Sequence, residues 1–125
     1  MILHITSQKE WEKTQINGEY TAPSLNDDGF IHCSTLKQTI DTANLFFKGQ
    51  KGLVLLCIDE KKLKSECKFE NPVGAGVELH DPRADNFFPH IYGPINISAV
   101  IKALDFPLNE KGIFELPNEL TNLNC

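Results

Sequence analysis

The stretch Gly52-Leu-Val-Leu-Leu-Cys-Ile-Asp59 holds a continuous apolar run, Leu53 to Ile58, between a glycine and an aspartate. A strand with one face in water alternates apolar and polar residues, whereas a strand covered on both faces is apolar throughout. The run therefore predicts a central strand that is buried on both sides.

The start of the chain predicts a second strand, from Met1 to Thr6. Successive side chains of a strand point to opposite faces, so Leu3 and Ile5 would share one face. His4 and Thr6 would share the other face, which places an imidazole beside a hydroxyl.

The segment after this strand carries the signals of a helix. Ser7-Gln-Lys-Glu10 has the spacing of a capping box, in which a hydroxyl and a carboxylate bond to each other's backbone N–H groups. The predicted helix carries Trp11 and Ile16 and is ended by Gly18.

A second capping box, formed by Thr35 and Gln38, predicts a helix that stops at Gly49. Its apolar residues keep a 3.6-residue spacing over 36–47. Two caps are possible: if Thr35 is the N-cap, the hydroxyl of Ser34 remains available to a cleft. If Ser34 is the cap, that hydroxyl is committed to backbone N–H groups.

The other predicted elements are shorter. We expect strands at Phe30–Ser34, Cys67–Phe69, Ile97–Phe106 and Ile113–Leu116, a helical turn at Glu60–Ser65, loops at Tyr20–Asp28 and Asn71–Asn86, a turn at Asn109–Gly112, and a frayed polar tail after Pro117. Strands mixed with two well-capped helices, without the regular alternation of a doubly wound sheet, indicate an α+β domain.

Composition limits the class of protein. The 125 residues have the size of a single domain, 1–125, with its core in 1–116 and a polar tail in 117–125. No apolar run approaches the roughly 20 residues of a membrane span, and the start does not resemble a secretion signal, so the expected location is cytoplasmic. The net charge of −5 argues against a broad surface for nucleic acid or membranes.

The cysteines predict reduced thiols. Cys33, Cys57, Cys67 and Cys125 show no C-x-x-C spacing, and a domain of this size does not need disulfides. Cys33 alternates with His32 and Ser34, so it should point into the core.

Three of the four histidines stand two residues from a hydroxyl: His4 before Thr6, His32 before Ser34, and His90 before Tyr92. In extended backbone each pair shares one face. Apolar residues would fill a core at a lower desolvation cost, so three such pairs indicate a polar cleft.

Four chemistries could use this cleft. The sequence has no H-x-H or H-E-x-x-H motif that would indicate zinc ligation. A serine hydrolase would need a nucleophile elbow, which the sequence also lacks. A histidine general base is allowed but is not indicated by spacing alone. A cleft that hydrogen-bonds a ribose or pyrophosphate uses every group in the set.

Arg83 is the one arginine of the chain and lies between Asp81 and Asp85. Its planar fork suits a phosphate or a carboxylate of a ligand. An ion pair with either neighbouring aspartate is the favoured alternative.

Four motifs together point to a family: His4-Ile-Thr6, Gly18-Glu-Tyr with Ala22-Pro-Ser-Leu25, Gly29-Phe-Ile-His-Cys-Ser34, and Phe88-Pro-His-Ile-Tyr-Gly-Pro94. They resemble the domain-of-unknown-function family 952 over about residues 1–106. That family is grouped with the ADP-ribosyltransferases, so the resemblance implies an ADP-ribosylation-like fold of split, bent, mainly antiparallel sheets around an NAD cleft.

The resemblance also implies roles. His4 looks like the histidine that grips a ribose, and His32 with Ser34 would fall near the nicotinamide pocket, while the transferases' catalytic glutamate has no secure counterpart. We therefore expect an NAD or ADP-ribose-like ligand, with transfer or hydrolysis at its nicotinamide-bearing carbon as the candidate reaction, and no metal. The opposing hypotheses are a non-catalytic module for a metabolite or a protein and, third, a zinc hydrolase. The catalytic candidates are His4, His32 and His90; the ligand-binding candidates are Thr6, Ser24, Ser34, Tyr92 and Arg83.

Overall fold

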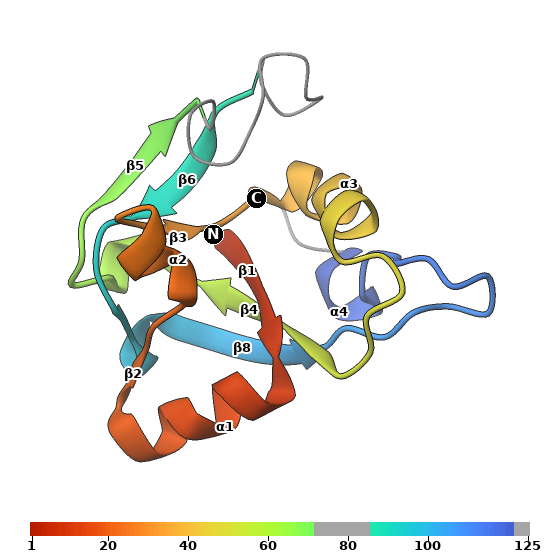
Figure 1. The fold of residues 1–125 in the computed structure, drawn as a ribbon, viewed down its shortest axis with the longest axis horizontal. Helices are drawn as coiled ribbons and strands as arrows, with labels where there is room; N and C mark the ends of the chain where they lie inside the picture. The colour runs from red at the N-terminus through yellow and green to blue at the C-terminus, as the bar shows by residue number, and fades with distance from the viewer. Residues whose placement is uncertain (72–85, 122–125) are drawn as a thin grey trace.

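The computed structural model describes residues 1–71 and 86–121 (Figure 1). Its first sheet is antiparallel with the order β1 (Ile2–Ser7), β4 (Leu53–Ile58) and β8 (Val100–Asp105). β4 is the middle strand and all of its residues are buried. The central, doubly covered strand predicted from the apolar run is confirmed.

The first sheet separates two apolar clusters, and β1 contributes to both. Leu3 and Ile5 lie in one cluster with the buried residues of α3 (Leu36–Phe46) and α4 (Asn118–Thr121). Ile2 lies in the other cluster, which faces the remaining sheets. The predicted alternation along β1 is therefore confirmed, and His4 and Thr6 lie on the side of the second cluster.

The second sheet has the order β3 (Ile31–His32), β6 (Phe88–Ile91) and β5 (Cys67–Glu70), all antiparallel. A third pair joins β2 (Glu19–Tyr20) to β7 (Ile95–Asn96). Just after β3, Leu3 and Ser34 exchange two backbone hydrogen bonds of 2.8 Å. The edge of β1 thereby meets the second sheet, and the α+β class is confirmed.

Both long helices begin where their caps predict. α1 (Gln8–Asn17) is capped by Ser7 Oγ, which accepts from the Glu10 N–H at 3.1 Å, and Gly18 ends it with a φ of +80°. Ile16 is 86% exposed, so it is not a core position. At the start of α3 the reciprocal capping box of Thr35 is complete, which leaves the Ser34 hydroxyl outside the cap.

Several short elements differ from the prediction. The expected loop 20–28 contains α2 (Pro23–Asp27), where proline occupies a first-turn position that needs no N–H donor. The expected strand 97–106 begins as η2 (Ile97–Ala99), and 113–116 forms a single bridge at Phe114 rather than a strand. The tail does not fray at its start, because Leu120 of α4 is buried.

Other short predictions agree. A helical turn is present as η1 (Glu60–Lys62), and β5 lies where a strand was expected. Cys33 and Cys57 are buried thiols and Cys67 is half-buried. Cys125 and most of the expected loop 71–86 lie outside the described residues. In the described ranges, no helix has the length and apolar character needed to cross a bilayer.

Candidate functional site

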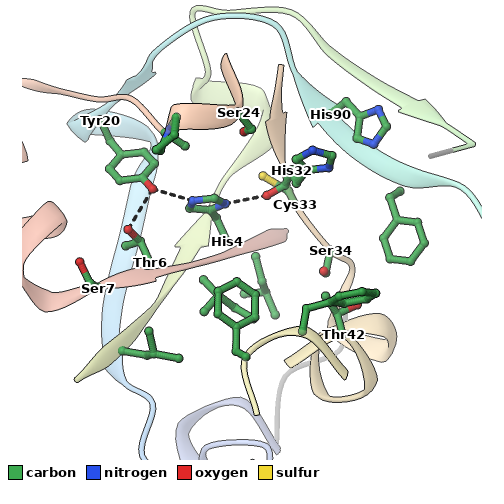
Figure 2. A pocket seen from close by; sticks show the side chains of 18 of the residues that line it. His4, Thr6, Ser7, Tyr20, Ser24, His32, Cys33, Ser34, Thr42 and His90 are labelled. Atoms are coloured by element: carbon green, nitrogen blue, oxygen red, sulfur yellow. Dashed lines mark hydrogen bonds between the residues drawn. The ribbon is translucent and has the colours of Figure 1, made fainter. Parts of the chain in front are cut away.

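A pocket of about 500 Å³ lies where the edge of β1 meets β3, α2 and the end of α3 (Figure 2). Six of the predicted site residues line it: His4, Thr6, Ser24, His32, Ser34 and His90. Thus the expected convergence of the three histidine segments is observed. Tyr92 is not among the lining residues, and Arg83 lies outside the described residues.

His4 is held at both ring nitrogens. Its Nδ1 lies 2.6 Å from the carbonyl oxygen of His32, and its Nε2 lies 2.7 Å from the hydroxyl of Tyr20. The Tyr20 hydroxyl is in turn 2.9 Å from Thr6 Oγ1. Figure 2 shows this chain of contacts running along one wall of the pocket.

The partners of His4 fix its proton. Burial lowers the pKa of His4 to about 4, so the ring is neutral at pH 7. A carbonyl oxygen can only accept, and Nδ1 therefore carries the proton, while Nε2 accepts from the Tyr20 hydroxyl. Thr6 then supplies the proton of the Tyr20–Thr6 bond. With both nitrogens engaged, His4 ties β1 to β2 and β3 rather than presenting a free base.

The pocket follows the edge of β1 and not one of its faces. Five consecutive residues, 3–7, line it, whereas a pocket over one face would be lined by alternate residues. Leu3 directs its N–H and C=O away from β4, toward Ser34. Because backbone groups alternate between the two edges of a strand, those of Ile5 also point away from β4, toward the pocket.

Ile5 therefore offers the pocket one N–H donor and one C=O acceptor, side by side. Among residues 1–71 and 86–121, no backbone group pairs with them on this side. The second sheet meets β1 at Leu3 and diverges beyond it, so the sheet is open where the pocket begins. An unpaired strand edge is a ready template for a ligand that carries its own donor and acceptor.

His32 lies closer to the surface than His4. Its Nε2 is 2.9 Å from Asp28 Oδ2, and both side chains are about one-third exposed. The ring meets Phe30 edge-on with centroids 4.8 Å apart, and it meets His90 edge-on at 5.5 Å.

His90 is buried in the second sheet, and its partner is a glutamate. Nδ1 of His90 lies 3.0 Å from Glu70 Oε1, and the Tyr92 hydroxyl donates to the same oxygen. These two hydrogen bonds, that of Tyr92 first, hold the pKa of the Glu70 carboxyl below its ordinary value. Burial is the main cause that lowers the pKa of His90, against the opposing effect of its hydrogen bond to Glu70.

The walls of the pocket are otherwise uncharged and largely apolar. Its lining includes Phe46, Phe47, Leu53 and Phe88, and among its described lining residues there is no lysine, arginine, aspartate or glutamate. Within the described ranges, no three histidine, cysteine or carboxylate side chains are grouped to hold a metal ion. The arrangement suits a mostly neutral ligand held by directional hydrogen bonds.

Sequence reasoning missed three residues of this site. Tyr20 was placed in a loop, although it belongs to one of the motifs of the family resemblance. Glu70 gave no local signal, because its contact with His90 depends on how β5 pairs with β6. Phe30 stacks on His90 with ring centroids 3.9 Å apart, a contact that is equally non-local.

The prediction for Tyr92 is confirmed in part. Its hydroxyl lies beside His90 as predicted, since both side chains meet the same Glu70 oxygen, but Tyr92 does not line the pocket. Tyr92 is therefore linked to the pocket by contacts through Glu70 and His90.

Comparison with known proteins agrees with these motifs. Residues 5–103 match the family described as "Protein of unknown function (DUF952)". The chain belongs to this family. No protein with curated function matches it.

Solved structures of a relative share the fold. The X-ray crystal structure of protein CC0527 from Caulobacter crescentus is 32% identical, with a TM-score of 0.78, and the match covers 95% of this chain and 96% of that one. A solution NMR structure of CC0527 gives 30% identity and a TM-score of 0.70 over 96% of both chains. CC0527 therefore shares the overall fold of this chain.

Proposed function

We propose that this domain has an ADP-ribosyltransferase-like architecture and that its pocket binds a nicotinamide nucleotide such as NAD. The observation that carries the proposal is the open edge of β1 at Ile5, inside a pocket with an apolar wall and several hydroxyl groups. Its volume of about 500 Å³ lies in the range of small-molecule and cofactor sites.

A primary carboxamide is complementary to the edge at Ile5. Its C=O would accept from the Ile5 N–H, and its NH₂ would donate to the Ile5 C=O, as an added strand would. The flat nicotinamide ring would then contact the apolar lining, to which Phe46 and Phe47 contribute. The carboxamide itself is uncharged, which suits a lining without lysine, arginine, aspartate or glutamate among its described residues.

The ribose would lie among the hydroxyls and imidazoles. Ser34, Ser24 and His32 line the pocket, and Ser34 is not used as a helix cap. These groups both donate and accept, which fits the vicinal hydroxyls of a ribose. The pyrophosphate would extend beyond this lining, and Arg83 remains our candidate partner for it.

The second candidate function is a metabolite-binding module without catalysis. The observation that favours it is the state of His4, whose two ring nitrogens are both committed to structural partners. No carboxylate is found among the described lining residues either, since Glu70 contacts His90 instead.

The test is an NMR titration that follows the backbone amide of Ile5. Nicotinamide and NAD are expected to shift this amide saturably. Nicotinate should not, because its carboxylate has no N–H to donate to the Ile5 carbonyl. The proposal fails if neither nicotinamide nor NAD moves the Ile5 amide at millimolar concentration.

A matched pair of variants sharpens this test. Ile5→Pro removes the N–H that points into the pocket, and an outward N–H on an edge strand is not needed by the sheet. Ile5→Val keeps the N–H and trims the same side chain. Nicotinamide binding should disappear in Ile5→Pro and persist in Ile5→Val; equal binding by the two variants would contradict the docking.

A further inference from the structure

The buried Nε2 atom of His90 has no hydrogen-bond partner in the described part of the chain. His90 is 1% exposed and lines the pocket. A buried polar atom without a partner destabilises a fold by roughly 1–3 kcal/mol, so most such atoms are paired. The atom is therefore a candidate contact for a ligand.

The opposite side of the ring determines what Nε2 can do. Glu70 accepts from two donors, the Nδ1–H of His90 and the Tyr92 hydroxyl, and an ionised carboxylate has no proton to give. Nδ1 therefore keeps the proton. In the neutral ring this leaves Nε2 with a bare lone pair, which can only accept.

Aromatic neighbours hold the ring in place. Phe30 stacks on His90 with an interplanar angle of 15°, and His32 meets it edge-on. These contacts fix the direction of the Nε2 lone pair. His32 also contacts the Phe30 ring and the partly exposed Asp28, and its own side chain is 36% exposed.

We propose that His90 Nε2 is the acceptor for a hydroxyl of the bound ligand, and that Glu70 and Tyr92 are positioning residues that keep this nitrogen free of a proton. The inference rests on the proposed function, in which the hydroxyl belongs to the ribose next to nicotinamide. Because Nε2 is buried in the ligand-free protein, binding must move a neighbouring side chain, and we assign this movement to the His32 ring that contacts His90.

This assignment predicts selectivity at the inner end of the pocket. A hydroxyl or N–H group is accepted there, whereas a phosphate or carboxylate oxygen would face a lone pair with the Glu70 charge behind it. The phosphates of the nucleotide must therefore lie away from His90. The nucleoside end of the ligand, rather than its phosphates, should therefore lie against His90.

The experiment uses the full chain with ¹⁵N-labelled histidine. Spectra that correlate ring protons with ring nitrogens distinguish a protonated nitrogen from a bare one. In the ligand-free protein we expect the proton of His90 on Nδ1. Addition of NAD should shift Nε2, whereas nicotinamide, which has no hydroxyl, should shift the Ile5 amide alone.

Two variants with matched charge test the role of Glu70. Glu70→Ala should let the His90 proton move to Nε2. The affinity for NAD should then fall about tenfold, which is the effect of losing about one charge-assisted hydrogen bond. Nicotinamide affinity should not change. Glu66→Ala is the control, since Glu66 lies near the same strand, is 66% exposed and pairs with Lys68.

Each contrary outcome has its own meaning. If Nε2 carries the proton in the ligand-free protein, the inference is overturned while nucleotide binding can still stand. If NAD shifts the Ile5 amide and leaves Nε2 unmoved, the inference is again overturned. If NAD shifts neither, the proposed function fails and this inference fails with it.

Discussion

Lowering the pH from 7 to 5 is expected to reduce the free energy of unfolding by about 2 kcal/mol through His4 alone. The native pKa of His4 is about 4, because burial disfavours the charged ring, against an ordinary value of 6.5 in the unfolded chain. As the pH falls below 6.5, His4 becomes protonated in the unfolded state but stays neutral in the native state. Stability therefore falls across the window from about 6.5 to about 4.

The magnitude follows from this difference in pKa. Each pKa unit corresponds to about 1.4 kcal/mol, so the complete effect is about 3 kcal/mol, and some two-thirds of it is reached by pH 5. The structural cause is that an imidazolium would bring a second N–H to a buried site. Nε2 now accepts from Tyr20, and this hydroxyl would have to turn to receive the new proton.

The assay is urea unfolding of the wild type and His4→Asn at pH 5 and at pH 7. Asparagine keeps an N–H donor for the His32 carbonyl but does not titrate. The variant should lose about 2 kcal/mol less than the wild type between the two pH values, whatever its own starting stability. Equal losses in the two proteins would refute the assignment of a neutral, buried His4.

Three further predictions concern stability and are measured by urea unfolding at pH 7. Tyr20→Phe should cost about 1–3 kcal/mol because it leaves His4 Nε2 unpaired; an unchanged midpoint would mean that water replaces the hydroxyl. Leu55→Ala should cost about 2–5 kcal/mol through a cavity in the central strand, whereas Ile101→Ala, at a residue that is 54% exposed, should cost less than about 0.5 kcal/mol. Thr35→Ala should cost about 1 kcal/mol by removing the cap of α3, and no loss would show that the box is redundant.

The parts of the fold that depend on local signals were predictable. The strand at Leu53–Ile58 is apparent from its unbroken apolar run, and the helix that starts at Leu36 from the capping box before it. In both cases the deciding residues are neighbours in sequence. The convergence of His4, His32 and His90 also followed from a repeated local pattern.

The parts that depend on tertiary contacts were not predictable. α4 has four residues, and its position is set by the burial of Leu120 rather than by a periodic pattern. Glu70 meets His90 because β5 and β6 pair in one particular register, which no sequence spacing encodes. The open edge at Ile5 likewise depends on where the second sheet leaves β1.

Hydrogen exchange at the bridge between Leu3 and Ser34 would report whether a ligand occupies the pocket. Two amide protons hold the sheets together at this point, and the mouth of the pocket lies just beyond it. Any opening of one sheet away from the other must break both bonds, so the two amides should exchange with solvent at matching rates. A molecule that spans the gap would slow both by the same factor, and this factor would measure its affinity without any knowledge of its chemistry.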